Sequence, residues 1–117
     1  MRAAAVISEA SMTTFDKREE GFEKQFVHDE ELRFKASARR NRMLGIWAAE
    51  KLGLSGTQAD AYAKEVIIAA VDTGESGVFQ KIRQDFDKKG IVQSDHQIRR
   101  TMDELMARAV AEVKASG

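Results

Sequence analysis

None of the 117 residues of this chain is a proline. A proline inside a helix removes a backbone donor and clashes with the preceding turn, so its absence allows long uninterrupted helices. Apolar residues make up 43% of the sequence and charged residues 32%, a balance typical of a small folded helical protein. No alternation of apolar and polar residues is long enough to predict a strand. We therefore predict one all-α domain.

The longest predicted helix runs from Thr13 to Leu52. Its C-terminal part, residues 43–52, is dense in apolar residues, as expected of a helix that packs into a core. Its N-terminal part is mostly charged. The two parts are therefore predicted to serve different purposes, the second for folding and the first for contact with a partner.

A stripe of phenylalanines marks the N-terminal part of this helix: Phe15, Phe22 and Phe26. Spacings of seven and four residues place the three rings on one helical face, within about 40° at 3.6 residues per turn. No later segment offers a matching apolar face. We therefore expect residues 12–34 to be reserved for another protein, and to project or be disordered when the chain is free.

Three further amphipathic helices are predicted after this one. Their apolar residues recur at the i, i+3, i+4 and i+7 positions expected of one buried face. Together with residues 35–52 they predict a four-helix bundle over residues 35–117. The predicted core positions of these three helices are Ala59, Tyr62, Ala63, Val66, Ile67, Ala70, Val78, Phe79, Ile82, Phe86, Ile98, Met102, Leu105, Met106, Ala109 and Val113.

Capping residues and glycines predict where these helices begin and end. Thr57 with Asp60 is expected to cap the second helix, and a glycine-containing break is expected over residues 72–77. The third helix is expected to end at Gly90. Ser94 and Gln97 match the pattern of a capping box for the fourth helix.

The first eleven residues fit poorly with the rest of the chain. One arginine and a short apolar patch are reminiscent of a signal peptide, but the patch is short and Glu9 follows it closely. We expect Met12 to be the functional start, with residues 1–11 a disordered extension or a wrongly assigned start.

Charge is balanced over the whole chain but segregated along the first helix. Nineteen basic and nineteen acidic residues cancel, which argues against nucleic acid as a partner. One stretch, residues 33–42, contains five basic residues and no acidic one. It is interpreted either as a solvated face balanced by acidic helices of the same domain or as a docking surface for an acidic partner. The five residues are Arg33, Lys35, Arg39, Arg40 and Arg42.

Residues suited to catalysis or metal binding are scarce. The two histidines, His28 and His96, belong to no motif with a nucleophile, and no Glu-x-x-His pair of a di-iron bundle occurs. Cysteine is absent, which excludes disulfides and thiolate metal sites and suits the cytoplasm. The longest apolar run, residues 66–71, is too short to insert into a membrane. No enzymatic activity, metal or cofactor is predicted, and Trp47 is expected in the core.

Residues 12–50 closely resemble the zeta subunit of alphaproteobacterial F-type ATP synthases. The similarity opens with Met12-Thr-Thr-Phe-Asp-Lys-Arg-Glu-Glu-Gly-Phe-Glu-Lys-Gln-Phe26 and closes with Phe34-Lys-Ala-Ser-Ala-Arg-Arg-Asn-Arg-Met-Leu-Gly-Ile-Trp-Ala-Ala-Glu50. Residues 61–66 and 102–105 are similar to the family as well. The resemblance implies a four-helix bundle whose N-terminal segment inhibits ATP hydrolysis by the catalytic head, the assembly of alpha, beta and gamma subunits.

This resemblance also implies a mechanism. The segment would enter a cleft between a catalytic and a non-catalytic subunit near the rotor shaft and block rotation in the hydrolysis direction. The helical face, rather than the resemblance, suggests the contact residues. Phe15, Phe22 and Phe26 would form an apolar anchor, and a polar rim would consist of Lys17, Arg18, Glu19, Glu20 and Lys24.

An alternative interpretation is a non-enzymatic helical adaptor, unrelated to ATP synthase, that holds an acidic protein through residues 33–42. Weak nucleotide binding by the bundle has no motif to support it. In either interpretation the free protein is expected to be a monomer.

Overall fold

The computed structural model describes residues 29–116, which form three helices and no strand. Residues 29–51 are helical and are called helix 29–51 below. Helix α2 spans Gly56–Lys89 and helix α3 spans Asp95–Ser116. The prediction of an all-α fold is confirmed. None of the helices between residues 29 and 116 combines the length and the apolar character that a membrane span requires.

Residues 34–117 form one compact unit. The predicted extension, residues 1–11, lies outside the described residues, as does most of the predicted inhibitory segment. Their assignments stay predictions.

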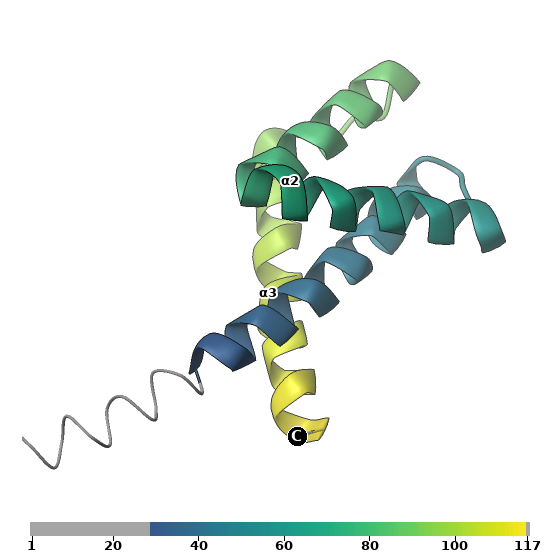
Figure 1. Cartoon of the computed structure of the whole chain (residues 1–117). Helices are drawn as coiled ribbons and strands as arrows, with labels where there is room; N and C mark the ends of the chain where they lie inside the picture. Colours follow the sequence, from purple (N-terminus) through teal and green to yellow (C-terminus); the bar gives the residue numbers. More distant parts are fainter. Residues whose placement is uncertain (1–28, 117) are drawn as a thin grey trace, which may run out of the picture. The chain divides into compact units, whose positions relative to one another are not determined.

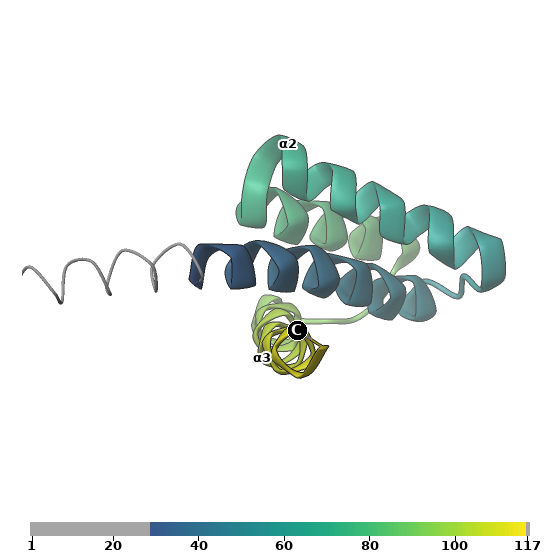
Figure 2. The same cartoon turned by 60° about the horizontal axis from the view of Figure 1, so that its bottom comes forward.

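Residues 29–116 form three helices rather than the predicted four, because the predicted break at residues 72–77 is a kink at Gly74 that lies within α2. Within α2 only Gly74 leaves the helical conformation, at φ 75° and ψ −163°, a backbone region open essentially to glycine. The hydroxyl of Thr73 donates to the carbonyl of Ala69 at 2.7 Å just before this kink. Beyond the kink α2 folds back on itself, so that it has a first arm, residues 56–73, and a second arm, residues 75–89 (Figure 2). Lys81 of the second arm binds Glu65 of the first arm at 2.9 Å.

The core forms where α2 and α3 pack on opposite sides of residues 34–51. Figure 1 labels α2 and α3, and Figure 2 shows the helix of residues 34–51 lying between them. All four predicted core residues of the second α2 arm are buried, and the other predicted stripes are buried or half-buried. Each helix contributes to the interior. The largest fully buried side chains are Phe86, Leu44, Ile82, Ile98, Val66 and Val78.

Helix 29–51 and the first arm of α2 lie very close together at Gly45. A Cβ atom on Gly45 would lie 2.6 Å from the Cα of Ala63 and 3.0 Å from its Cβ. These separations are too short for any side chain, so the helices can pack this tightly only with glycine at position 45.

The helix ends combine confirmed and incorrect predictions. Ser94 and Gln97 form the predicted capping box, with reciprocal bonds of 2.8 and 3.1 Å from each backbone N–H to the other side chain. Helix α2 ends at Gly90, as predicted, in the left-handed conformation. The predicted Thr57 cap is wrong, because α2 begins at Gly56 and Ser55 occupies the N-cap position.

Candidate functional site

The predicted contact residues of the inhibitory segment all precede residue 29 and lie outside the described residues. The structure therefore describes only the basic stretch among the predicted binding residues. Of that stretch, Arg33 and Lys35 are exposed. The three arginines that follow differ from them, because each contacts an acidic side chain of α2 or α3.

Arg40 is an internal residue, with only 3% of its surface exposed. Its Nε donates to Oδ1 of Asn41 at 2.9 Å, and its Nη1 donates to Oε1 of Glu75 at 2.7 Å. Glu75 directly follows the kink at Gly74, so this ion pair joins helix 29–51 to the turn of α2. Burial of a guanidinium requires such compensation. The prediction that Arg40 belongs to a docking surface is therefore wrong.

Arg39 and Arg42 are exposed, and each forms an ion pair at the surface. Arg39 lies 3.2 Å from Glu112 of α3, and Arg42 lies 3.7 Å from Asp60 of α2. All four side chains are substantially exposed, and such surface pairs contribute little to stability. Acidic residues of the same domain thus partly balance the basic stretch, while two arginines remain accessible to a partner.

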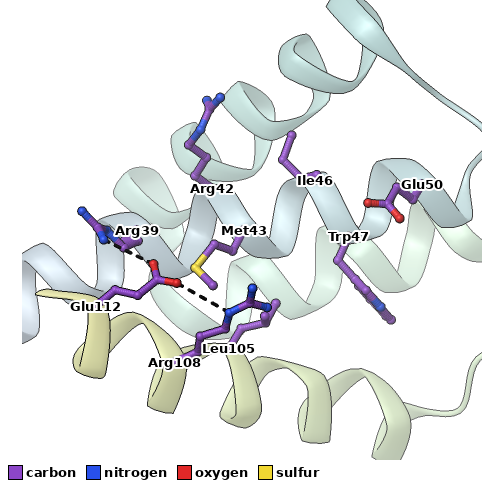
Figure 3. Close-up of a pocket in the computed structure, with 9 residues that line it drawn as sticks. All are labelled: Arg39, Arg42, Met43, Ile46, Trp47, Glu50, Leu105, Arg108 and Glu112. Carbon is purple, nitrogen blue, oxygen red and sulfur yellow. Dashed lines mark hydrogen bonds and ion pairs between the residues drawn. The ribbon is translucent and has the colours of Figure 1, made fainter. Parts of the chain in front are cut away.

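A groove lies between helix 29–51 and α3, with a volume of about 680 Å³ (Figure 3). Its apolar lining consists of Met43, Ile46, Trp47 and Leu105, all half-buried. We call it the Trp47 groove. Trp47 packs against the core, its ring centroid 5.7 Å from that of Phe86, but it is not enclosed by the core as predicted. The indole therefore presents part of its surface to the groove.

Charged residues form the rim of the Trp47 groove. The rim contains Arg39, Arg42, Glu50, Arg108 and Glu112. Glu112 lies 3.2 Å from Arg39 and 3.5 Å from Arg108, so one carboxylate is shared by two guanidinium groups (Figure 3). The rim holds one more guanidinium than carboxylate groups.

Sequence reasoning missed this groove because its two walls are 55 or more residues apart in the chain. The α3 wall does show a local pattern: Leu105, Arg108 and Glu112 lie at i, i+3 and i+7 and so share one helical face. That pattern shows a shared face. It does not show which helix the face meets.

A second polar cluster joins the two arms of α2. The hydroxyl of Tyr62 donates to Asp85 at 2.7 Å, and Lys81 contacts Asp85 at 3.0 Å and lies 4.9 Å from the Tyr62 ring centroid. Burial, reinforced by the bond to Asp85, raises the pKa of Tyr62 well above its usual value. For Lys81, burial acts to lower the pKa, but bonds to Glu65 and Asp85 outweigh it and raise the pKa. The cluster is thus most stable with both groups protonated.

These shifts predict a loss of stability at alkaline pH. A group whose pKa is raised by folding stabilises the fold fully below its unfolded pKa, about 10 for tyrosine, and this contribution is lost as pH rises further. We expect Tyr62→Phe to cost about 1 kcal/mol at neutral pH through the lost hydrogen bond. The variant should then lose less stability than the wild type between about pH 9 and about pH 11. Denaturant unfolding at both pH values tests this.

The same experiment has an internal control, because Tyr62 is the only tyrosine in the chain. Ultraviolet absorbance of the phenolate therefore reports its titration directly. Titration of the folded protein at the ordinary tyrosine pKa would contradict the burial and the bond to Asp85.

Among residues 29–116 no group of three or more His, Cys, Asp or Glu side chains is placed to hold a metal ion. His96 is exposed near the start of α3. The features that stand out in the described part of the chain are a small helical core and a groove with apolar and arginine side chains. They define a small helical protein with a surface suited to protein contacts.

The sequence matches the family described as ATPase inhibitor subunit zeta over residues 12–112, and the chain belongs to this family. The structure is similar to a protein solved by solution NMR, with a TM-score of 0.63 and 38% sequence identity. That similarity covers 74% of this chain and 99% of the NMR chain. A search of curated proteins returned no match. The predicted family membership is confirmed.

Proposed function

We propose that this protein inhibits ATP hydrolysis by the catalytic head of F-type ATP synthase through residues 12–34. The observation that carries the proposal is the extent of the family match. The match begins at residue 12 and so includes the phenylalanine stripe, which precedes the compact unit of residues 34–117. A segment that belongs to an inhibitor family and precedes the unit containing the core is suited to contact a partner.

In the proposed complex the segment enters a cleft between a catalytic and a non-catalytic subunit, next to the rotor shaft. Phe15, Phe22 and Phe26 fill apolar space in the cleft. Burial of three such rings yields roughly 5–9 kcal/mol before costs, at about 1.5–3 kcal/mol each. Ordering a segment on binding consumes much of this free energy. The charged rim from Lys17 to Lys24 therefore has to contribute further contacts.

The protein acts in this proposal as a regulator and not as a catalyst. The segment of residues 12–34, bound at the interface, blocks the rotary cycle in the hydrolysis direction and leaves synthesis possible. The compact unit of residues 34–117 serves as the carrier of the segment. The partners are the alpha, beta and gamma subunits of the head, and the free protein is a monomer.

An adaptor function through the basic stretch is the second candidate. The accessible guanidinium groups of Arg39 and Arg42 favour it, whereas the burial of Arg40 removes one of its five predicted contacts. The two functions differ in the segment they require, residues 12–34 or residues 33–42.

Adding the protein to purified catalytic head and measuring ATP hydrolysis tests the proposal. We expect the full chain to lower the rate in a saturable manner and the chain lacking residues 1–33 to have no effect. The shortened chain should still unfold cooperatively by circular dichroism, because the described buried residues lie between Ala36 and Ala109. Equal inhibition by both chains would show that the inhibitory surface lies in the compact unit.

A further inference from the structure

We infer that the Trp47 groove binds an acidic amphipathic helix on the same catalytic head, which gives the compact unit its own contact with the enzyme. The inference rests on the proposed function, because it takes the head as the partner. It adds a second binding site, which shares no residue with the phenylalanine stripe and is formed by helix 29–51 and α3 together.

The length of the groove suits a helix. Its lining residues on helix 29–51 extend from Arg39 to Glu50, 11 positions further along the chain. At 1.5 Å per residue this distance is about 16 Å, or three helical turns. Helix-in-groove recognition uses a trough of this kind, in which apolar residues at i, i+3 or i+4, and i+7 serve as anchors.

The apolar lining provides the surface for those anchors. Trp47 is half-buried and partly accessible from the groove, and tryptophan is among the residues that contribute most to binding at protein interfaces. Met43 lies one turn before it, and its flexible side chain adapts to irregular partner surfaces. Leu105 completes the lining from α3. An apolar strip across both helices remains uncovered within the described part of the protein.

The charges on the rim of the groove determine which kind of partner helix binds and in which direction it lies. Arg39 and Arg108 share Glu112, and Arg42 pairs with Asp60 of α2. Three guanidinium groups thus meet two carboxylates at this end, whereas Glu50 lies at the other end of the groove. The arginine end therefore carries uncompensated positive charge. A partner helix with acidic residues clustered at one of its ends complements this arrangement.

Two substitutions on α3 form a matched test in the full chain. Arg108→Glu reverses a rim charge, and Arg100→Glu reverses an arginine outside the groove lining. Both arginines pair with a glutamate four residues later, and their side chains are 68% and 70% exposed. We expect Arg108→Glu to weaken binding to the head about tenfold, and Arg100→Glu to change it less than about twofold. Arg108→Gln, which adds no negative charge, should have an intermediate effect.

A local readout comes from Trp47, the only tryptophan in the chain. Labelling it with 5-fluorotryptophan gives a single fluorine NMR signal at the groove. We expect this signal to shift or broaden beyond the effect of molecular size when catalytic head is added. Arg108→Glu should reduce that change at a fixed head concentration, and circular dichroism should show that the variant is folded.

The outcomes distinguish a failure of the groove inference from a failure of the proposed function. Absence of any binding by the wild type would overturn both. Binding and inhibition with an unchanged Trp47 environment, or with equal effects of the two charge reversals, would overturn the groove alone. A Trp47 signal that depends on protein concentration before head is added would assign the groove to a second copy and overturn this inference. A signal that moves on replacing Phe22 and Phe26 in the unbound chain would assign it to the chain's own N-terminal segment, with the same consequence.

Discussion

Replacing Phe22 and Phe26 together with alanine is expected to weaken inhibition of the catalytic head by at least about a hundredfold. In the proposed function each ring is an anchor worth about 1.5–3 kcal/mol, and about 1.4 kcal/mol corresponds to a factor of ten in affinity. The thermal midpoint should be nearly unchanged, because the buried residues of the compact unit pack against one another. Inhibition titrations and thermal unfolding of the same preparation measure both quantities.

Phe34→Ala provides the matched control for this double substitution. Phe34 is 76% exposed, and it follows Phe26 by eight residues, which places it about 80° from the stripe at 100° per residue. We expect little change in either inhibition or stability. A large fall in the melting temperature of the Phe22 and Phe26 variant, with inhibition retained at low temperature, would instead assign these rings to the core.

Replacing Phe86 with alanine is expected to destabilise the compact unit by about 3–5 kcal/mol. Phe86 has no exposed surface and is the largest of the fully buried side chains. Domains of this size have a total stability of about 5–15 kcal/mol, so the variant loses a large share of it. At about 4–8 °C per kcal/mol, the melting temperature should fall by roughly 12–40 °C. Thermal unfolding followed by circular dichroism gives the value.

Trp47 supplies a second readout for the same variant, since its ring packs against that of Phe86. Its fluorescence should shift toward longer wavelength as the cavity admits water or the contact loosens. Val92→Ala is the control, because Val92 is 94% exposed and its truncation removes no buried surface. A loss below about 1 kcal/mol for Phe86→Ala would contradict the central position assigned to this ring.

The position of Trp47 links the core to the proposed contact surface. One part of the indole packs on Phe86 and another part lines the groove beside Met43. A partner that binds the groove therefore contacts a side chain supported by the core, which keeps the surface rigid and limits the entropy lost on binding.

The helical content and most of the core follow from local patterns in the sequence. Helical periodicity is a local property, and residues such as Val78, Phe79, Ile82 and Phe86 reveal their buried face by spacing alone. The Ser94 capping box is equally local, since its two partners are three residues apart. The motifs of residues 12–50 also identified the family, and the family match over residues 12–112 confirms this prediction. The phenylalanine stripe is likewise read from spacing, and its role stays a prediction.

Which helical surfaces meet depends on the packing of the helices against one another. The break predicted at residues 72–77 is a kink at Gly74, and the other residues of this stretch stay helical. Arg40 resembles its basic neighbours in sequence, yet it is buried because its position on helix 29–51 directs it toward Glu75. The Trp47 groove forms where one face of helix 29–51 lies beside α3. Such facts depend on contacts between residues far apart in the chain, and local spacing carries no information about them.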